Sequence, residues 1–314
     1  MSWCVSCAAV TQSGWIALIA MAVAIVSLVA MARVAPRLLP PWMVAGSASA
    51  TLALGAGFAS GMIEAPGVAV LLVFGALCYL YRQAVRPKVA VALAVPIGML
   101  AVLLATHKMP GFHGLPLIGP TTLCDGCQKW WVIGHLDKPA VGLLLFVVAL
   151  VNLTLPSSPS SGGTTPHRLA RSAVVTVAAV TVMGVVVMGL MSLFSAVRWA
   201  PKAPDIDVVM TFAAVNIFFT VFAEEVFFRM FLHDVLRRFP ETFTRTWQLV
   251  AVSAALFALA HVAGGPLYVV GALLAGIGYG WVYEKTRRIE WAIVAHFGVN
   301  AIHFFLFSYP RLSL

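Results

Sequence analysis

Long apolar runs, separated by short polar segments, follow one another along the whole chain. A membrane-spanning helix needs about 20 mostly apolar residues, and about ten runs come close to this length. They are residues 15–32, 42–62, 66–81, 89–105, 140–155, 173–197, 206–236, 246–262, 267–283 and 289–308. The pattern therefore predicts an all-α fold, a polytopic transmembrane helical bundle with one span for each run.

Composition points to the same class of protein. Hydrophobic residues make up 61% of the 314 residues and charged residues only 10%, whereas soluble domains are about 25% charged. The formal net charge of +9 would suit nucleic-acid binding, but the basic residues lie in short clusters between the apolar runs, as topology signals do. We therefore expect membrane lipids around the chain and no nucleic-acid partner.

The basic residues also predict the orientation of the chain. With ten spans, the loops on one side carry thirteen Lys and Arg residues and the other side carries six, while Arg229 completes the 20 from within a span. Basic residues favour the cytoplasmic side. Both termini are thus predicted to lie outside the cytoplasm, in a bacterial or archaeal cytoplasmic membrane.

Two polar segments interrupt the apolar pattern. Residues 156–171 begin with a stretch rich in Ser, Gly and Pro, which is typical of a flexible linker. This linker predicts an N-terminal membrane bundle in residues 1–155, with about five spans, and a C-terminal membrane bundle in residues 172–314. Residues 107–138 form the longest loop, which is rich in Gly, Pro and Trp and lies outside in this topology.

Four of the five cysteines form two Cys-x-x-Cys pairs, Cys4/Cys7 and Cys124/Cys127. Both pairs fall on the outer side of the expected topology, whereas Cys78 lies in a span. Such pairs can form disulfides in an oxidising compartment, bind zinc together, or remain incidental thiols. No compact zinc-binding domain surrounds them, and the sequence leaves their role open.

Ionisable groups inside the apolar runs are concentrated in the last four runs. A charge within a span is costly and therefore indicates a functional site. The groups in question are Glu224, Glu225, Arg229, His261, His296 and His303. The first six runs hold essentially none, so any reaction centre is expected in the C-terminal part of the chain.

The spacing of these residues predicts which of them meet. Glu225 and Arg229 lie four residues apart with the acid first, the favourable order for an ion pair on a helix. A structural salt bridge explains this pair equally well, but Glu224 points elsewhere on the helix and needs another partner. His296 and Asn300 also share one helical face, which indicates a lined cavity, whereas a lone His261 at a span end is more typical of an interfacial residue.

Together these groups can attack a carbonyl with water. A carboxylate or imidazole can take a proton from water, while imidazole and amide N–H groups can hold the developing oxyanion. Apolar helices would exclude bulk water and strengthen each contact. Counted along straight helices from the cytoplasmic ends, Glu224 lies about 20 Å deep, His261 about 24 Å and His296 about 12 Å. This spread leaves open how the three converge.

Three motifs give the chain a resemblance to a known family. Glu-Glu-x-x-x-Arg at 224–229, Phe-x-x-x-His at 257–261 and His-x-x-x-Asn at 296–300 resemble, in order and on separate helices, the motifs of the CPBP family of intramembrane proteases. This family, also called Abi, includes the CAAX prenyl endopeptidases. The resemblance covers residues 205–308 and implies a catalytic core there.

The resemblance implies a role for each matching residue. Glu224 would activate water, and the oxyanion site would be formed by His261, His296 and Asn300. Glu225 and Arg229 would support the site. We further expect Phe257 and His303 to contact substrate. Such enzymes have been described both as glutamate-dependent and as metal-dependent; we expect no cofactor, with zinc as the open alternative because a carboxylate and two histidines could hold it.

The sequence therefore predicts an intramembrane endopeptidase, a hydrolase that processes a membrane-anchored protein or lipidated peptide near its terminus. Two other classes fit the same polar groups. One is a non-catalytic membrane protein that keeps the family scaffold, as an immunity or partner factor. The other is an ion or proton transporter, which would normally show repeat symmetry or broken helices in both halves.

Overall fold

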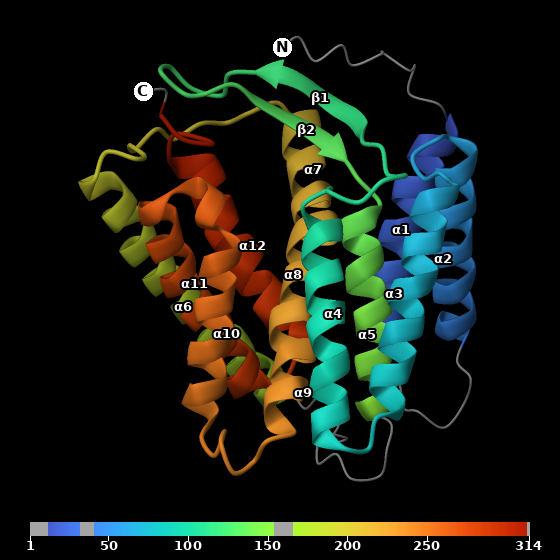
Figure 1. Ribbon diagram of the computed structural model, residues 1–314. Helices are drawn as coiled ribbons and strands as arrows, with labels where there is room; N and C mark the ends of the chain where they lie inside the picture. Colours follow the sequence, from blue (N-terminus) through green and yellow to red (C-terminus); the bar gives the residue numbers. More distant parts are fainter. Residues whose placement is uncertain (1–11, 32–40, 154–165, 313–314) are drawn as a thin grey trace.

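The computed structural model describes residues 12–31, 41–153 and 166–312. These residues form a helical bundle with one small β-hairpin at one end (Figure 1). The N-terminal half consists of α1 (Gln12–Met31), α2 (Pro41–Ala59), α3 (Ala65–Gln83), α4 (Pro87–Ala105), β1 (Leu115–Thr121), β2 (Trp130–Gly134) and α5 (Asp137–Leu153).

The C-terminal half contains one very long helical segment. It begins with α6 (Pro166–Leu193), and the segment from 206 to 237 follows as α7 (Ile206–Ala214), η1 (Val215–Val221), α8 (Phe222–Glu225), η2 (Val226–Phe231) and α9 (Leu232–Arg237). The last elements are α10 (Thr246–Ala260), η3 (Val262–Gly264), α11 (Pro266–Thr286) and α12 (Ile289–Leu306). Here η1 and η2 are π-helical and η3 is a 3₁₀ turn.

The helices confirm the predicted polytopic bundle. Within the described residues, seven helices are long and apolar enough to cross a membrane, and α10 is apolar but shorter. Each of the ten expected runs coincides with a helix. Large apolar side chains such as Leu72, Val174 and Val185 point outward and are about 70% exposed, as lipid-facing residues are. The number of ten spans stays a prediction.

The hairpin is an element that the sequence did not predict. β1 and β2 pair antiparallel within the loop 107–138, and a disulfide between Cys124 and Cys127 lies in the turn that joins them. Burial alternates along β2, with Trp130 and Val132 buried. Trp130 packs 5.6 Å from the ring of Phe304 in α12, so the hairpin is anchored on the end of the bundle. Cys4 and Cys7 lie outside the described residues.

The ends of the helices follow the alternation that the ten runs imply. Figure 1 shows the hairpin, the start of α1 and the end of α12 at the top, and the α3–α4 and α9–α10 connections at the bottom. The chain thus has the relative sidedness that the basic residues predict. Which side faces the cytoplasm stays a prediction.

The two halves of the chain pack closely. One hydrophobic cluster joins Phe146 of α5 to Phe222 and Val226 of the segment 206–237, and the rings of Phe146 and Phe222 lie 5.8 Å apart. Of the expected linker 156–171, residues 156–165 lie outside the described residues and 166–171 belong to α6. The division into two bundles therefore stays a prediction.

Candidate active site

The two glutamates lie between two π-helical turns. α8, which carries Glu224 and Glu225, is only four residues long, with η1 before it and η2 after it. π-helical turns are rare and occur frequently at functional sites, where they change the direction of side chains within one helix. This local irregularity marks α8 as the centre of the segment 206–237.

Glu225 joins two charged partners from two helices. Its Oε2 atom lies 3.2 Å from Arg229 Nε, and its Oε1 atom lies 2.8 Å from Nδ1 of His296 in α12. The side chains of Glu225 and Arg229 are fully buried. The predicted ion pair is therefore present, and Glu225 also holds His296 with its Nδ1–H directed at a carboxylate.

Arg229 contacts polar and aromatic groups of α10 and α11. Its Nη1 donates to the Ser253 hydroxyl at 3.2 Å, and its Nη2 donates to the Gly276 carbonyl at 3.3 Å. The guanidinium also lies 5.2 Å from the centre of the Phe257 ring, a cation–π distance. Ser253 in turn donates to the Phe228 carbonyl at 2.9 Å. Arg229 therefore links α10 and α11 to the glutamate segment.

The ring of His296 is clamped between two aromatic side chains. Tyr279 stacks on it, with centroids 4.3 Å apart and planes 14° apart. Phe257 meets it edge-on at 5.7 Å. Because Nδ1 is engaged by Glu225, the free nitrogen Nε2 faces Glu224, whose Oε2 lies 3.9 Å away. A water molecule beside these two atoms, about 2.8 Å from each, can hydrogen-bond to both.

Glu224 has a partner that the sequence did not reveal. Nζ of Lys138, in the first turn of α5, lies 2.6 Å from Glu224 Oε1, and both side chains keep about 15% of their surface exposed. Gly142 makes this pairing possible: a Cβ there would lie 2.7 Å from Cα of Ala223, so only glycine lets α5 come this close to α8. Lys138 and Gly142 are four residues apart and share one face of α5.

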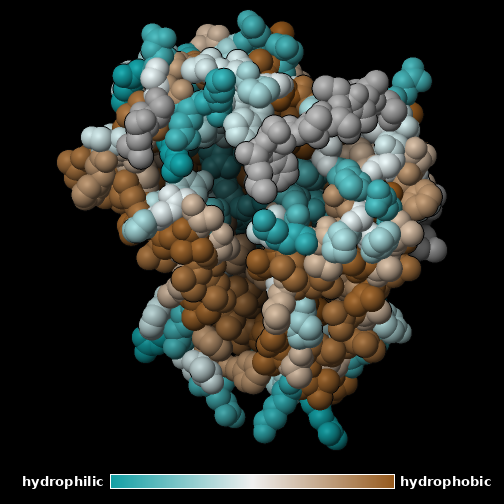
Figure 2. Space-filling view, turned by 45° about the horizontal axis from the view of Figure 1, so that its top comes forward, coloured by the Kyte–Doolittle hydropathy of each residue, from teal (hydrophilic) through white to brown (hydrophobic). Residues whose placement is uncertain are grey.

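Water can reach the hairpin side of the bundle. Figure 2 shows a hollow lined by hydrophilic residues on this side, above a belt of apolar surface. The partial exposure of Glu224 and Lys138 contrasts with the complete burial of Glu225 and Arg229. The two adjacent glutamates therefore have different surroundings, one partly open and one sealed.

His261 and Phe257 lie together at the end of α10. Nδ1 of His261 donates to the Phe257 carbonyl at 2.7 Å, and the two rings are 4.5 Å apart. Phe257 thus touches both imidazoles, and Glu224 interacts electrostatically with His261 as well as with His296. Despite their different depths along the sequence, His296 lies 3.9 Å from Glu224, and Phe257 lies beside both His261 and His296. Phe257 itself is 2% exposed.

Asn300 and His303 lie further along α12. The Asn300 amide donates to Oδ1 of Asn216 in η1 at 3.1 Å, which ties the third motif to the glutamate segment. His303 lies instead toward the end of α12, where its Nε2 contacts the Ser308 carbonyl at 3.1 Å and its ring lies 4.9 Å from that of Tyr309. The face that carries His296 and Asn300 therefore continues toward the hairpin.

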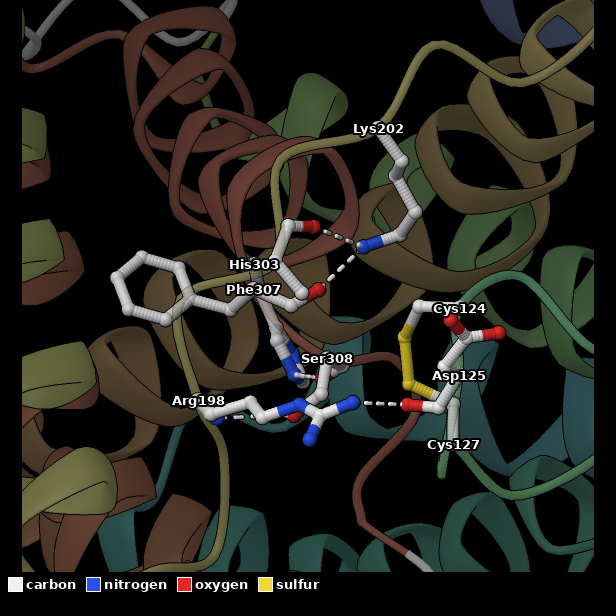
Figure 3. Close-up of a disulfide and its surroundings, with 9 residues drawn as sticks. Cys124, Asp125, Cys127, Arg198, Lys202, His303, Phe307 and Ser308 are labelled. Carbon is white, nitrogen blue, oxygen red and sulfur yellow. Dashed lines mark hydrogen bonds between the residues drawn. A yellow bond between two sulfur atoms is a disulfide. The ribbon is translucent and has the colours of Figure 1, made fainter.

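The surroundings of His303 are shown in Figure 3. Lys202 donates to the Phe307 carbonyl, and Arg198 donates to the Asp125 carbonyl beside the disulfide. Burial lowers the pKa of Lys202, which lies in the connection between α6 and α7. These contacts tie the connection between α6 and α7 to the end of α12 on one side and to the turn of the hairpin on the other.

The site residues that the sequence missed are Lys138, Asn216, Ser253 and Tyr279. Asn216 and Ser253 are single polar residues in apolar runs, which is the only sequence signal they give. Lys138 stands at the start of a run, where a lysine normally reads as a boundary residue. None of them belongs to a recognisable motif, so their roles follow from packing.

Glu224, His261 and His296 are also a set of donors that zinc accepts. In the structure, however, the cation beside Glu224 is the Lys138 ammonium at 2.6 Å. A divalent ion bound to this carboxylate would face that ammonium directly, so the residues as arranged do not fit a metal. The expectation that no cofactor is needed stays a prediction.

Comparison with protein families gives one match. Residues 207–302 match the family model described as type II CAAX prenyl endopeptidase Rce1-like. Over these residues the chain is similar to that family. The match contains all three motifs and the Glu225–Arg229–His296 cluster, and it lies within the expected core 205–308. Comparisons with curated proteins and with solved structures gave no match.

Similarity to the Rce1-like family over residues 207–302 supports the coarser part of the functional prediction. The family is one of proteases that act on prenylated or membrane-anchored proteins, and the apolar helices make this chain an integral, multi-pass membrane protein. The family match leaves the individual catalytic residues and the substrate to be proposed.

Proposed function

We propose that this protein is an intramembrane endopeptidase in which Glu224 activates water and His296 faces it across the reaction site. The observation that carries this proposal is the arrangement of two adjacent glutamates. Glu225 is buried and orients His296 through Nδ1 at 2.8 Å, whereas Glu224 is partly open and faces Nε2 of the same ring at 3.9 Å. One carboxylate thus orients and the other reacts, as in other base–imidazole–carboxylate sites.

The reaction can be written with these groups. Glu224 takes a proton from a water molecule as the water oxygen bonds to the scissile carbonyl carbon, which becomes a tetrahedral oxyanion. When the carbonyl re-forms, the C–N bond breaks, and the protonated Glu224 returns its proton to the leaving amine. Protons and electrons balance, and the carboxylate is regenerated for another turnover.

The oxyanion needs donors, and the structure restricts which atoms can serve. Nδ1 is already engaged in both His261 and His296, so each ring can donate through Nε2 only when it is doubly protonated. Asn300 uses one amide hydrogen on Asn216 and retains a second. We propose that the Asn300 amide and imidazolium Nε2–H groups stabilise the oxyanion.

Substrates must bring an extended segment to Glu224. Backbone groups that leave a helix within lipid need water or protein partners, so a chain near the membrane surface and close to a terminus is the easiest to accommodate. The hydrophilic hollow on the hairpin side offers a route for such a segment (Figure 2). We propose a membrane-anchored or prenylated protein, cut near its C-terminus. The less favoured alternative is the C-terminal anchor of an exported protein, to which the disulfide-capable loops expected on the outer side point.

The substrate class predicts a specific change in the host. In cells that carry Glu224→Ala instead of the wild-type protein, membrane proteins processed by this enzyme should keep an uncleaved C-terminal segment. Mass spectrometry of the termini of membrane proteins in the two strains tests this. If only soluble proteins with internal cleavages differ, the proposed substrate class is wrong; if no terminus differs, a non-catalytic role for the scaffold is favoured.

Lys138 is expected to act as a positioning residue for Glu224. Lys138→Met should lower kcat by about 10-fold or more, less than loss of the base itself, because the carboxylate loses the contact that holds it in place. Lys138→Arg keeps the charge and should restore part of the rate. The matched control is Lys129→Met, which removes an exposed lysine of the hairpin. Initial rates at saturating substrate measure the effect, and an unchanged kcat in Lys138→Met would exclude this role.

A further inference from the structure

We infer that His107, His135 and Asp137 form a binding site for a transition-metal dication, with zinc as the expected ion. Each residue offers one ligand atom, and these three atoms lie within 4.8 Å of one another. The cluster lies at the base of the hairpin, outside residues 207–302 that match the Rce1-like family. It contains none of the residues proposed to act around Glu224, although Asp137 directly precedes Lys138 in α5, and the inference does not depend on that site.

Three elements bring the ligands together. His107 follows the end of α4, His135 follows β2, and Asp137 is the first residue of α5. The side chain of Asp137 is fully buried, and both its oxygens lie within 2.9 Å of Nδ1 of His107. The two imidazole rings are stacked, with centroids 3.7 Å apart. A bound ion would thus join the two ends of the hairpin loop to the helices that flank it.

The unsatisfied nitrogen of His135 is an independent sign of a missing ligand. Nδ1 of His135 is buried and has no hydrogen-bond partner among the described residues. Buried polar atoms are nearly always paired, so such an atom calls for an explanation. Gly114 leaves the space that the His135 ring occupies, because a Cβ at Gly114 would lie 2.6 Å from Cε1 of that ring.

The backbone of His107 adds a second sign. Its φ angle is +57°, a left-handed conformation that is uncommon for residues other than glycine. Such conformations are strained and cluster at ligand-binding and active sites. At His107 this conformation turns the chain at the end of α4 and places the imidazole against Asp137 and His135.

The donor set suits zinc. Two imidazole nitrogens and one carboxylate oxygen are ligands of zinc sites that keep a fourth position for water. Bond lengths of about 2.0–2.2 Å place neighbouring ligands of a tetrahedral ion roughly 3.3–3.6 Å apart. The His107–Asp137 pair, now 2.8–2.9 Å apart, would open slightly to admit the ion, and ligand atoms up to 4.8 Å apart would move closer. The competing explanation is a plain ion pair between His107 and Asp137, which accounts for neither the stacked His135 ring nor its unpaired nitrogen.

Metal analysis of the purified full-length protein tests the site. The protein should carry no polyhistidine tag, should be stripped with a chelator in detergent, and should then be titrated with Zn²⁺ or Co²⁺. We expect close to one ion per chain, visible for Co²⁺ as ligand-field absorption and for Zn²⁺ by elemental analysis. His107→Gln and His135→Gln should each weaken Zn²⁺ binding by more than about 10–100-fold, because loss of a hydrogen-bond partner of a ligand alone has an effect of that size. The side chain of His107 is 38% exposed, so its replacement disturbs the fold less.

Matched variants separate this site from the other candidate ligands. His113→Gln changes a histidine of the same loop, paired with Glu64 at 3.0 Å and 56% exposed, and should leave Zn²⁺ binding unchanged. His296→Gln and the double variant Cys4→Ser/Cys7→Ser should also retain the ion. Zn²⁺ should raise the Tm of the wild-type protein, because an ion that binds only the folded state stabilises it, and should not raise that of His107→Gln.

Three outcomes would overturn the inference. The first is a stripped wild-type protein that takes up no Zn²⁺ or Co²⁺ and whose Tm does not change when either ion is added. The second is undiminished binding in a His107→Gln protein that is shown to be folded by its elution volume and Tm. The third is loss of binding in His296→Gln or in the cysteine double variant but not in His107→Gln, which would place the ion elsewhere in the chain.

Discussion

Replacing Glu224 with Gln is expected to lower the rate of cleavage by about 10²-fold or more while the protein still inserts and folds. The amide keeps the shape of the side chain and can still accept a hydrogen bond from Lys138, whose Nζ lies 2.6 Å away in the wild-type protein. What it loses is the basic oxygen that takes the proton from water. The rate with a membrane-anchored substrate, compared with elution volume and Tm in the same detergent, measures both parts of the prediction.

A matched control variant distinguishes loss of the catalytic base from loss of any carboxylate in the protein. Glu64→Gln removes a carboxylate that is 57% exposed and pairs with His113, and it should leave cleavage unchanged. Full cleavage by a well-expressed Glu224→Gln protein would remove Glu224 from the mechanism. Glu225→Gln would then be the next variant to measure, because Glu225 is the other carboxylate in contact with His296.

The features of the site that could be predicted from the sequence are those set by spacing along a single helix. Glu225 and Arg229 are four residues apart, and the structure pairs them at 3.2 Å. Glu224 was expected to need another partner, because it faces a different direction. That partner, Lys138, is separated from it by 86 residues, and the contact depends on how closely Gly142 lets α5 approach α8.

The other differences between the sequence-based predictions and the structure also arise from local geometry and from contacts between distant segments. The depths counted from the sequence assumed straight, parallel α-helices, whereas η1 and η2 interrupt the regular α-helix around the glutamates. The hairpin was missed because its alternation of buried and exposed residues extends over only five residues of β2. The cluster of His107, His135 and Asp137 arises only when the hairpin closes, so the spacing of its residues gives no signal.

Arg229→Ala should reduce stability as well as activity. Glu225 and Arg229 are completely buried, and the guanidinium also bonds to Ser253 and to the Gly276 carbonyl. Breaking a buried pair by removing one partner costs about 3–5 kcal/mol in soluble proteins, because the other charge is left uncompensated. We therefore expect a lower yield of folded protein, a lower Tm and no cleavage, measured side by side with Glu224→Gln, which should lose activity alone.

A double variant shows whether the unpaired Glu225 carboxylate causes the lower Tm expected for Arg229→Ala. Arg229→Met together with Glu225→Gln removes both charges and keeps similar volumes, and replacing a buried ion pair by neutral groups is often nearly neutral for stability. The double variant should therefore recover most of the Tm lost in Arg229→Ala but should stay inactive, because Glu225 no longer holds His296 through a charged hydrogen bond. An Arg229→Ala protein that is inactive with an unchanged Tm would contradict the structural role and would indicate that Arg229 contacts the substrate directly.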